Sequence, residues 1–234
     1  MADVAGGTLT ALLNAISAVA GLGTAAMGLV DSSKAIMGGP SNFGFGHIKR
    51  AVTPFINGAG TAFTATQIEH TLKANWLNGV ATADQKAKAK SLIHLGLAPG
   101  TAETLAKAAG VDAAKLTSLA TKLATGAEAS QDEINVLGQF DAVVSAVLDD
   151  AYERGDQIYR NACKLLSMAV STVLAVVAGW AIAGGADYFT TSKFPIALIV
   201  GLGATPLAPV AKDLASALQT AANAVGTVKR KAGS

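Results

Sequence analysis

The sequence predicts an all-α integral membrane protein with three transmembrane helices, a helical cytoplasmic domain, and a long continuous helix that joins this domain to the second span. Composition and charge spacing carry this prediction. The chain of 234 residues is 51% hydrophobic and 15% charged, and its mean hydropathy is +0.42. An ordinary soluble domain is about 25% charged. Lipid is therefore the expected solvent for part of the chain.

Three stretches without a charged side chain define the predicted spans, which are residues 6–30, 165–186 and 194–211. About 20 helical residues cross a hydrocarbon core of about 30 Å. The first two stretches are long enough, whereas the third has 18 residues and two prolines and is marginal by itself. Buried helices of a soluble protein are the alternative. Three such stretches in one short chain favour the membrane.

The distribution of charge predicts the orientation. Basic residues gather between the first two spans and in the basic tail, 212–234, whereas the other side receives only Asp3, Asp187 and Lys193. Positive residues stay on the cytoplasmic side. We therefore expect a cytoplasmic or bacterial inner membrane, with the N-terminus outside and the C-terminus inside. Because the leading residues MADVAGG contain no Lys or Arg, the first span is interpreted as an uncleaved anchor.

A cytoplasmic helical domain is predicted over residues 31–130. Its first part, 38–46, is rich in glycine and is expected to be a loop. The uncharged stretch 51–68 is interpreted as a segment that lies on the membrane surface or re-enters the membrane. Short helices separated by Gly and Pro should follow between Thr82 and Gly126.

One long helix is predicted after this domain. Ser130 and Glu133 form a capping box, and no proline follows until Pro195. The helix can therefore run from residue 131 to about 184, with 131–164 as a cytoplasmic stalk. Apolar residues at heptad spacing predict the packed face of the stalk, and they are Leu137, Phe140, Val144, Val147, Ala151 and Ile158.

Small residues recur at every fourth position in each predicted span. This spacing places them on one helix face, where backbones can approach closely, and such packing holds helices together in lipid. Three spans offer too few partners to cover all of these faces, so we expect a homo-oligomer. The Ala- and Gly-rich composition is the alternative explanation. The predicted packing residues are Ser17, Gly21 and Ala25; Ser171, Ala175, Gly179 and Ala183; and Ala197, Gly201 and Thr205.

Two prolines interrupt the third span. Pro206 and Pro209 each remove a backbone N–H and thereby free the carbonyls of Leu202 and Thr205. An unpaired carbonyl is costly in lipid. The pair is therefore a predicted hinge or cation-lining break, and a kink packed against another helix is the alternative. Asn14 in the first span also needs a polar partner, which we expect from another helix.

Asp149, Glu153 and Asp156 share one helix face shortly before the second span. In a ring of subunits they would attract cations to the mouth of a pore. The alternative is a solvated face. Heptad counting favours that alternative, because it places the three residues opposite the apolar stripe.

The sequence predicts no enzyme, no cofactor, no metal site and no nucleic-acid partner. Cys163 is the one cysteine, and His47, His70 and His94 lack the spacing of metal ligands on a helix. Residues 105–116 have the outline of a helix-turn-helix but offer no Arg for base contacts. Phosphate-binding loops and nucleophile elbows do not occur in the sequence.

The expected function is a homo-oligomeric membrane assembly that forms a pore or channel, with membrane lipids and copies of the chain as partners. The alternative is a membrane-anchored scaffold that recruits a cytoplasmic protein through its helical domain. As a third possibility, the hairpin 165–211 is flanked by charge and resembles in outline the insertion hairpin of pore-forming colicins. That resemblance implies a protein that stays soluble until it is triggered.

Overall fold

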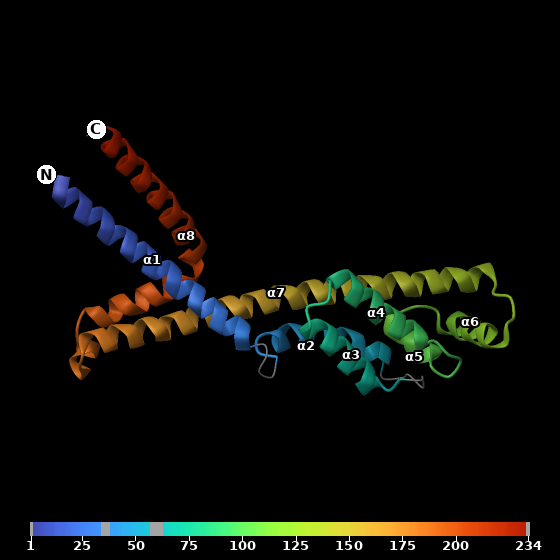
Figure 1. Ribbon diagram of the computed structural model, residues 1–234. Helices are drawn as coiled ribbons and strands as arrows, with labels where there is room; N and C mark the ends of the chain where they lie inside the picture. Colours follow the sequence, from blue (N-terminus) through green and yellow to red (C-terminus); the bar gives the residue numbers. More distant parts are fainter. Residues whose placement is uncertain (1, 34–37, 57–62, 233–234) are drawn as a thin grey trace. The chain divides into compact units, whose positions relative to one another are not determined.

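The computed structural model describes residues 2–33, 38–56 and 63–232, which form α-helices and one short 3-10 helix, with no strand among them. The predicted all-α class is therefore confirmed. The chain divides into two compact units: unit 1 comprises residues 1–37 and 161–234, and unit 2 comprises residues 38–160. Helix α7 (Gln131–Ala183) is continuous; it begins in unit 2 and ends in unit 1 (Figure 1).

The described residues of unit 2 form six helices. Thr64 caps one of them through a capping box with Gln67, and Asp112 caps another with its side chain. Gly110 and Gly126 end two helices in the left-handed conformation, with φ of 67° and 74°. The helices are α2 (Ser41–Ile56), α3 (Ala65–Leu77), α4 (Thr82–Leu95), α5 (Ala102–Ala109), α6 (Ala113–Thr125) and the first part of α7.

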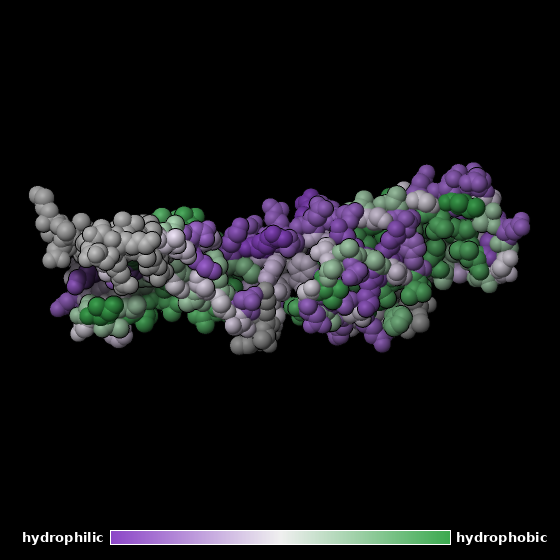
Figure 2. Space-filling model, turned by 45° about the horizontal axis from the view of Figure 1, so that its top comes forward, coloured by the Kyte–Doolittle hydropathy of each residue, from purple (hydrophilic) through white to green (hydrophobic). Residues whose placement is uncertain are grey.

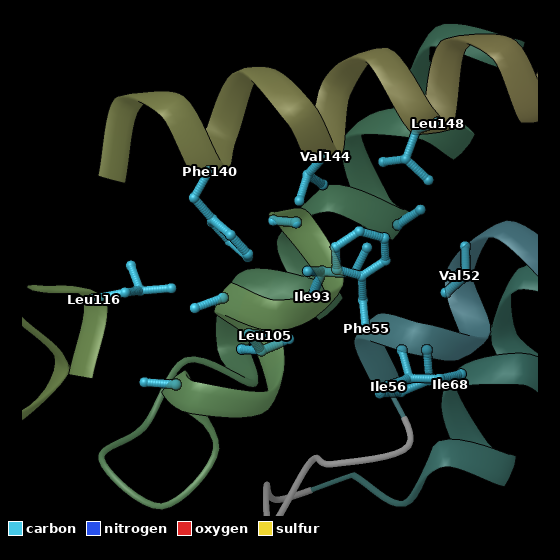
Figure 3. Packing of buried hydrophobic residues seen from close by; sticks show 14 of the residues in the cluster. Val52, Phe55, Ile56, Ile68, Ile93, Leu105, Leu116, Phe140, Val144 and Leu148 are labelled. Atoms are coloured by element: carbon cyan, nitrogen blue, oxygen red, sulfur yellow. The ribbon is translucent and has the colours of Figure 1, made fainter. Parts of the chain in front are cut away.

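The core of unit 2 lies against one face of α7 (Figure 3). Phe140, Val144, Leu148 and Tyr152 are all at most 2% exposed and follow one another at intervals of four residues. The ring of Phe55 on α2 meets that of Phe140 edge to face, with 6.5 Å between centroids. A single hydrophobic cluster therefore holds the short helices onto α7.

The buried face of α7 differs from the predicted heptad stripe. Phe140, Val144 and Ala151 are buried as predicted, but Leu137 and Val147 are only partly buried. The buried row instead advances by four residues at a time. The short helices cross α7 at an angle and pack against a row of side chains that are four residues apart. They do not follow the 3.5-residue seam along which two helices supercoil.

Two expectations for the start of unit 2 need correction. The glycine-rich loop predicted for 38–46 is shorter, because α2 begins at Ser41 and runs through Gly44. A Cβ atom on Gly44 would collide with the backbone of Gly155 and with the Trp76 ring, so glycine here permits a close helix crossing. The Trp76 indole N–H also donates to the Ser41 carbonyl, at 2.9 Å.

The other correction concerns the surface-lying or re-entrant segment predicted for 51–68. Residues 57–62 lie outside the described residues. On either side of them, Phe55, Ile56 and Ile68 are at most 5% exposed and belong to the core of unit 2. These apolar side chains pack against protein, so they do not present an apolar surface to lipid.

Glu133 ties α6 to the start of α7. Its carboxylate accepts hydrogen bonds from the Lys122 ammonium at 2.7 Å and from the Ser118 hydroxyl at 2.6 Å. The Ser130 backbone N–H is a third donor at 2.6 Å, which completes the predicted capping box. Led by the Lys122 bond, these donors lower the pKa of Glu133 from 4.5 to about 2. Glu133 therefore stays a charged acceptor at neutral pH.

Unit 1 contains α1 (Ala2–Ser32), the last part of α7, η2 (Ala186–Thr190) and α8 (Lys193–Ala232). Helix α8 passes through Pro206 and Pro209 without ending, and it changes direction along its length (Figure 1). Proline is the usual cause of a sharp kink. The predicted third span, 194–211, is only the first part of α8, because after Pro209 only Gly226 would weaken the helix before Ala232.

Gly44→Ala should destabilise unit 2, because the added methyl group would displace the backbone of Gly155. We expect the free energy of unfolding to fall by about 1–3 kcal/mol. Gly46→Ala is the matched control, since its Cβ would meet open space in the same helix. This substitution should raise the free energy of unfolding by about 0.5–1 kcal/mol. Thermal unfolding of the full chain in detergent, followed by Trp76 fluorescence in a Trp180→Phe background, measures both. Equal stability of the two variants would contradict the close crossing.

Candidate membrane surface and helix interface

Three helices of the described chain are long and apolar enough to cross a membrane, in the segments Thr10–Ser32, Gln131–Ala183 and Lys193–Leu214. Only 22%, 11% and 28% of their most apolar windows are buried. In a soluble protein such windows form the core. The most apolar parts of this chain are instead largely uncovered by its own residues.

The uncovered side chains are large. Ile182, Ile199 and Val210 are 86%, 71% and 63% exposed. Figure 2 shows hydrophobic side chains on the surface of unit 1, in the left half of the view. Contiguous exposed apolar surface of this kind marks a membrane or protein contact.

Helices α7 and α8 meet through small residues and a shared set of hydroxyl groups. The Ser171 hydroxyl donates to the Gly201 carbonyl at 2.6 Å, and its oxygen lies 3.2 Å from the Thr205 hydroxyl oxygen. Both side chains are buried. A Cβ on Gly201 would collide with Thr172 and with the Ser171 carbonyl. The structure thus brings together three of the predicted packing residues and hides their polar atoms from the surroundings.

Helix α1 packs through a face other than the one predicted. Gly23 fits against Ala204 and Ala208 of α8, where there is no space for a Cβ atom. Ser17, Gly21 and Ala25 are exposed, and a Cβ on Gly21 would meet nothing within 4 Å. Small residues occupy both faces of α1, so spacing alone does not choose between them. A contact of these three residues with another chain stays a prediction.

A polar seam runs along the exposed face of α1. Its positions alternate in spacing between three and four residues, which is the spacing of a coiled-coil seam. A search for small residues at every fourth position misses this seam, whereas a search for the heptad spacing of three and four residues detects it. All of its members are exposed, and they are Thr10, Asn14, Ser17, Gly21, Thr24 and Gly28.

Asn14 is the most polar member of this seam. Its side chain is exposed, and it makes no hydrogen bond within the described part of the chain. The Thr24 hydroxyl, by contrast, donates to the Ala20 carbonyl of its own helix at 2.8 Å. In hydrocarbon an amide without a partner costs several kcal/mol. Asn14 is therefore the position of α1 that most requires a polar partner from outside this chain.

The predicted cation-attracting face lies on the unit 2 part of α7 and is partly neutralised. Asp149 pairs with Lys86, and Asp156 pairs with Arg160, both at 2.7 Å, while Glu153 is exposed. Within the described ranges, no group of three or more His, Cys, Asp or Glu side chains is placed to hold a metal ion. Attraction of cations by these residues stays a prediction, as does the hinge at Pro206 and Pro209.

The turn between α7 and α8 is built from aromatic side chains. The rings of Tyr188, Phe189 and Phe194 meet edge to face, with centroids 5.2–6.0 Å apart. Tyr188 is 2% exposed and lies against Gly179, where a Cβ would collide with its hydroxyl. Trp180 is 49% exposed. Aromatic residues of this kind are typical of the boundary between membrane and water.

Gly201→Ala should weaken the contact between α7 and α8, because its methyl group would need the space of the Thr172 backbone. We expect the free energy of unfolding to fall by about 1–3 kcal/mol. Gly203→Ala is the control two residues away, where a Cβ would make an ordinary contact of 3.5 Å with Leu207. The unfolding of each variant in detergent, followed by Trp180 fluorescence in a Trp76→Phe background, measures the difference. Indistinguishable unfolding of the two variants would argue against this interface.

Comparisons of the chain with protein-family models, with curated proteins and with solved structures returned no match. The exposed apolar helices, the polar seam of α1 and the contacts described above are therefore the features from which function is inferred.

Proposed function

We propose that the chain is an integral membrane protein that crosses the bilayer three times, assembles with copies of itself and carries unit 2 as a folded cytoplasmic domain. One observation carries this proposal: the most apolar helix windows are only 11–28% buried. The basic residues between the first two spans and in the tail support a cytoplasmic position for unit 2 and for the C-terminus.

Energetic magnitudes favour lipid over water around unit 1. Seventeen large apolar side chains are exposed among the described residues of unit 1, most of them by about half or more. Burying such a side chain completely is worth roughly 1.5–3 kcal/mol, so half-exposure forgoes about 1 kcal/mol each. The sum is of the order of 15 kcal/mol, as large as the whole net stability of a typical domain. Lipid chains provide this burial without further protein.

The polar seam of α1 supports self-association. A second copy that presents the same seam offers an amide and hydroxyls to Asn14 and Ser17, and the small residue Gly21 lets the two backbones approach. Such a contact is self-complementary, as a symmetric interface requires. The assembly would then display several copies of unit 2 at the membrane surface, which suits a scaffold for a cytoplasmic partner.

Conduction through the assembly is the second candidate function, and the polarity of the same seam favours it. In a ring of copies with α1 at the centre, Asn14, Ser17 and Thr24 would face the axis and provide hydrogen-bonding groups along it. Flux of ions from liposomes that contain the purified protein tests this candidate. Absence of flux leaves the scaffold as the function of the assembly.

Membrane integration is tested by alkaline carbonate extraction of membranes from cells that express the full chain. We expect the protein to remain with the lipid, because three apolar helices hold a protein in the membrane far more strongly than surface charges hold a peripheral protein. A peripheral protein, released by the same treatment, serves as the control. A chain that remained a monodisperse monomer in buffer without detergent would overturn the proposal.

Asn14→Leu should weaken self-association, because it removes the amide that a second copy would engage. Interhelical hydrogen bonds in membranes are worth about 1–2 kcal/mol, so the dissociation constant should rise about tenfold. Asn14→Gln keeps the amide and is the matched control. Sedimentation equilibrium in a density-matched detergent measures the mass of the assembly. An unchanged mass distribution for Asn14→Leu would remove the seam from the interface.

A further inference from the structure

A groove of about 580 Å³ opens in unit 1 between α1, the end of α7 and the start of α8. Its described lining is aliphatic except for Tyr188 and Lys193. Four of the predicted packing residues line it: Ala175, Gly179, Ala183 and Ala197. Here the small side chains leave a space between helices instead of closing it. An apolar space of this size is within the range of ligand sites, about 300–1,000 Å³.

The dimensions of the groove favour a hydrocarbon chain as its occupant. The groove follows α7 from Ala175 to Ala183, which is about 12 Å of helix. A volume of about 580 Å³ over this length gives a mean cross-section of about 50 Å². A helix with its side chains is about 10–12 Å across, or roughly 80–110 Å² in section. The space therefore suits a flexible hydrocarbon chain better than a helix of another copy.

The polar end of the groove lies at the turn between α7 and α8. Lys193 is the first residue of α8 and is exposed, so its ammonium group adds to the partial positive charge of the helix N-terminus. The other charge of the turn, Asp187, is not among the lining residues. The Tyr188 hydroxyl is buried and has no hydrogen-bond partner among the described residues. It packs against Gly179 of the lining.

We propose that this groove binds one acyl chain of an anionic phospholipid, whose phosphate lies at Lys193. The ligand must be apolar over most of its length and anionic at one end, because the groove has this same division. In the proposed orientation this turn lies on the outer side of the membrane, and its cationic residue attracts an anionic headgroup there, as basic pockets between membrane helices do on the cytoplasmic side. The inference rests on the proposed membrane location of unit 1, since only there does the groove meet lipid.

Native mass spectrometry of the full chain, exchanged into detergent with equal amounts of phosphatidylglycerol and phosphatidylcholine, tests the headgroup contact. We expect phosphatidylglycerol to be retained preferentially by the unaltered protein. Lys193→Gln should lower its retention about fivefold, as loss of one cationic contact predicts. Lys212→Gln removes the same charge from an exposed position of α8 outside the groove and should leave retention unchanged. Equal retention by the two variants would overturn the headgroup contact.

The acyl-chain site is tested by filling the groove. Ala178→Phe places a ring in the lining, whereas Ala169→Phe places one on an exposed position of α7 outside it. We expect Ala178→Phe, but not Ala169→Phe, to lower the retention of both lipids. Unchanged retention would overturn the site. A cross-link between the Ala178→Cys side chains of two copies, in a Cys163→Ala background, would also overturn the site, because a second copy would then lie at the groove. Release of the protein by carbonate is a different result, because it would refute the proposed membrane location itself.

Discussion

Helix backbones that touch with almost no side chain between them are the contacts on which both units depend. In unit 2, Gly44 of α2 lies against Gly155 of α7. In unit 1, Gly201 of α8 lies against the backbone at Thr172, and Gly23 of α1 lies against Ala204. Such contacts tolerate no added methyl group, so they fix where each helix crosses its neighbour. The large apolar side chains then either fill a core or remain outside it.

The two units differ in where those large side chains go. In unit 2 they form a core, with Phe140, Leu148 and Tyr152 at most 2% exposed, and its surface carries paired charges, as in Asp149 with Lys86. In unit 1 most buried side chains are small or carry a hydroxyl group, as Ala204 and Ser171 do, and many large apolar side chains are exposed. This inversion is expected where lipid replaces water, because burial inside the protein then offers apolar groups no advantage.

Several features of the fold follow from sequence periodicity and caps alone. The start of α7 follows from the capping box at Ser130, and its length follows from a long interval without proline. The positions of the apolar helices follow from the charged residues at their ends. The start of α2 does not follow in this way. Glycine there signals a loop by its own propensity, and only the neighbouring Gly155 and Trp76 show why a helix passes through Gly44. The choice of α1 face is of the same kind, since Gly21 and Gly23 are equivalent until α8 is in place.

The sequence by itself determined the all-α class, the long α7 and the three helices able to cross a membrane, because hydrophobicity, charge boundaries and caps act over a few neighbouring residues. Only the tertiary structure decided which small residues close a contact, as Gly201 does, and which line an open groove, as Ala183 does. It also placed Lys193 and Tyr188 in the lining of that groove. The physical reason is that spacing along a helix specifies a face, whereas the distance from that face to its neighbour depends on residues far away in the chain.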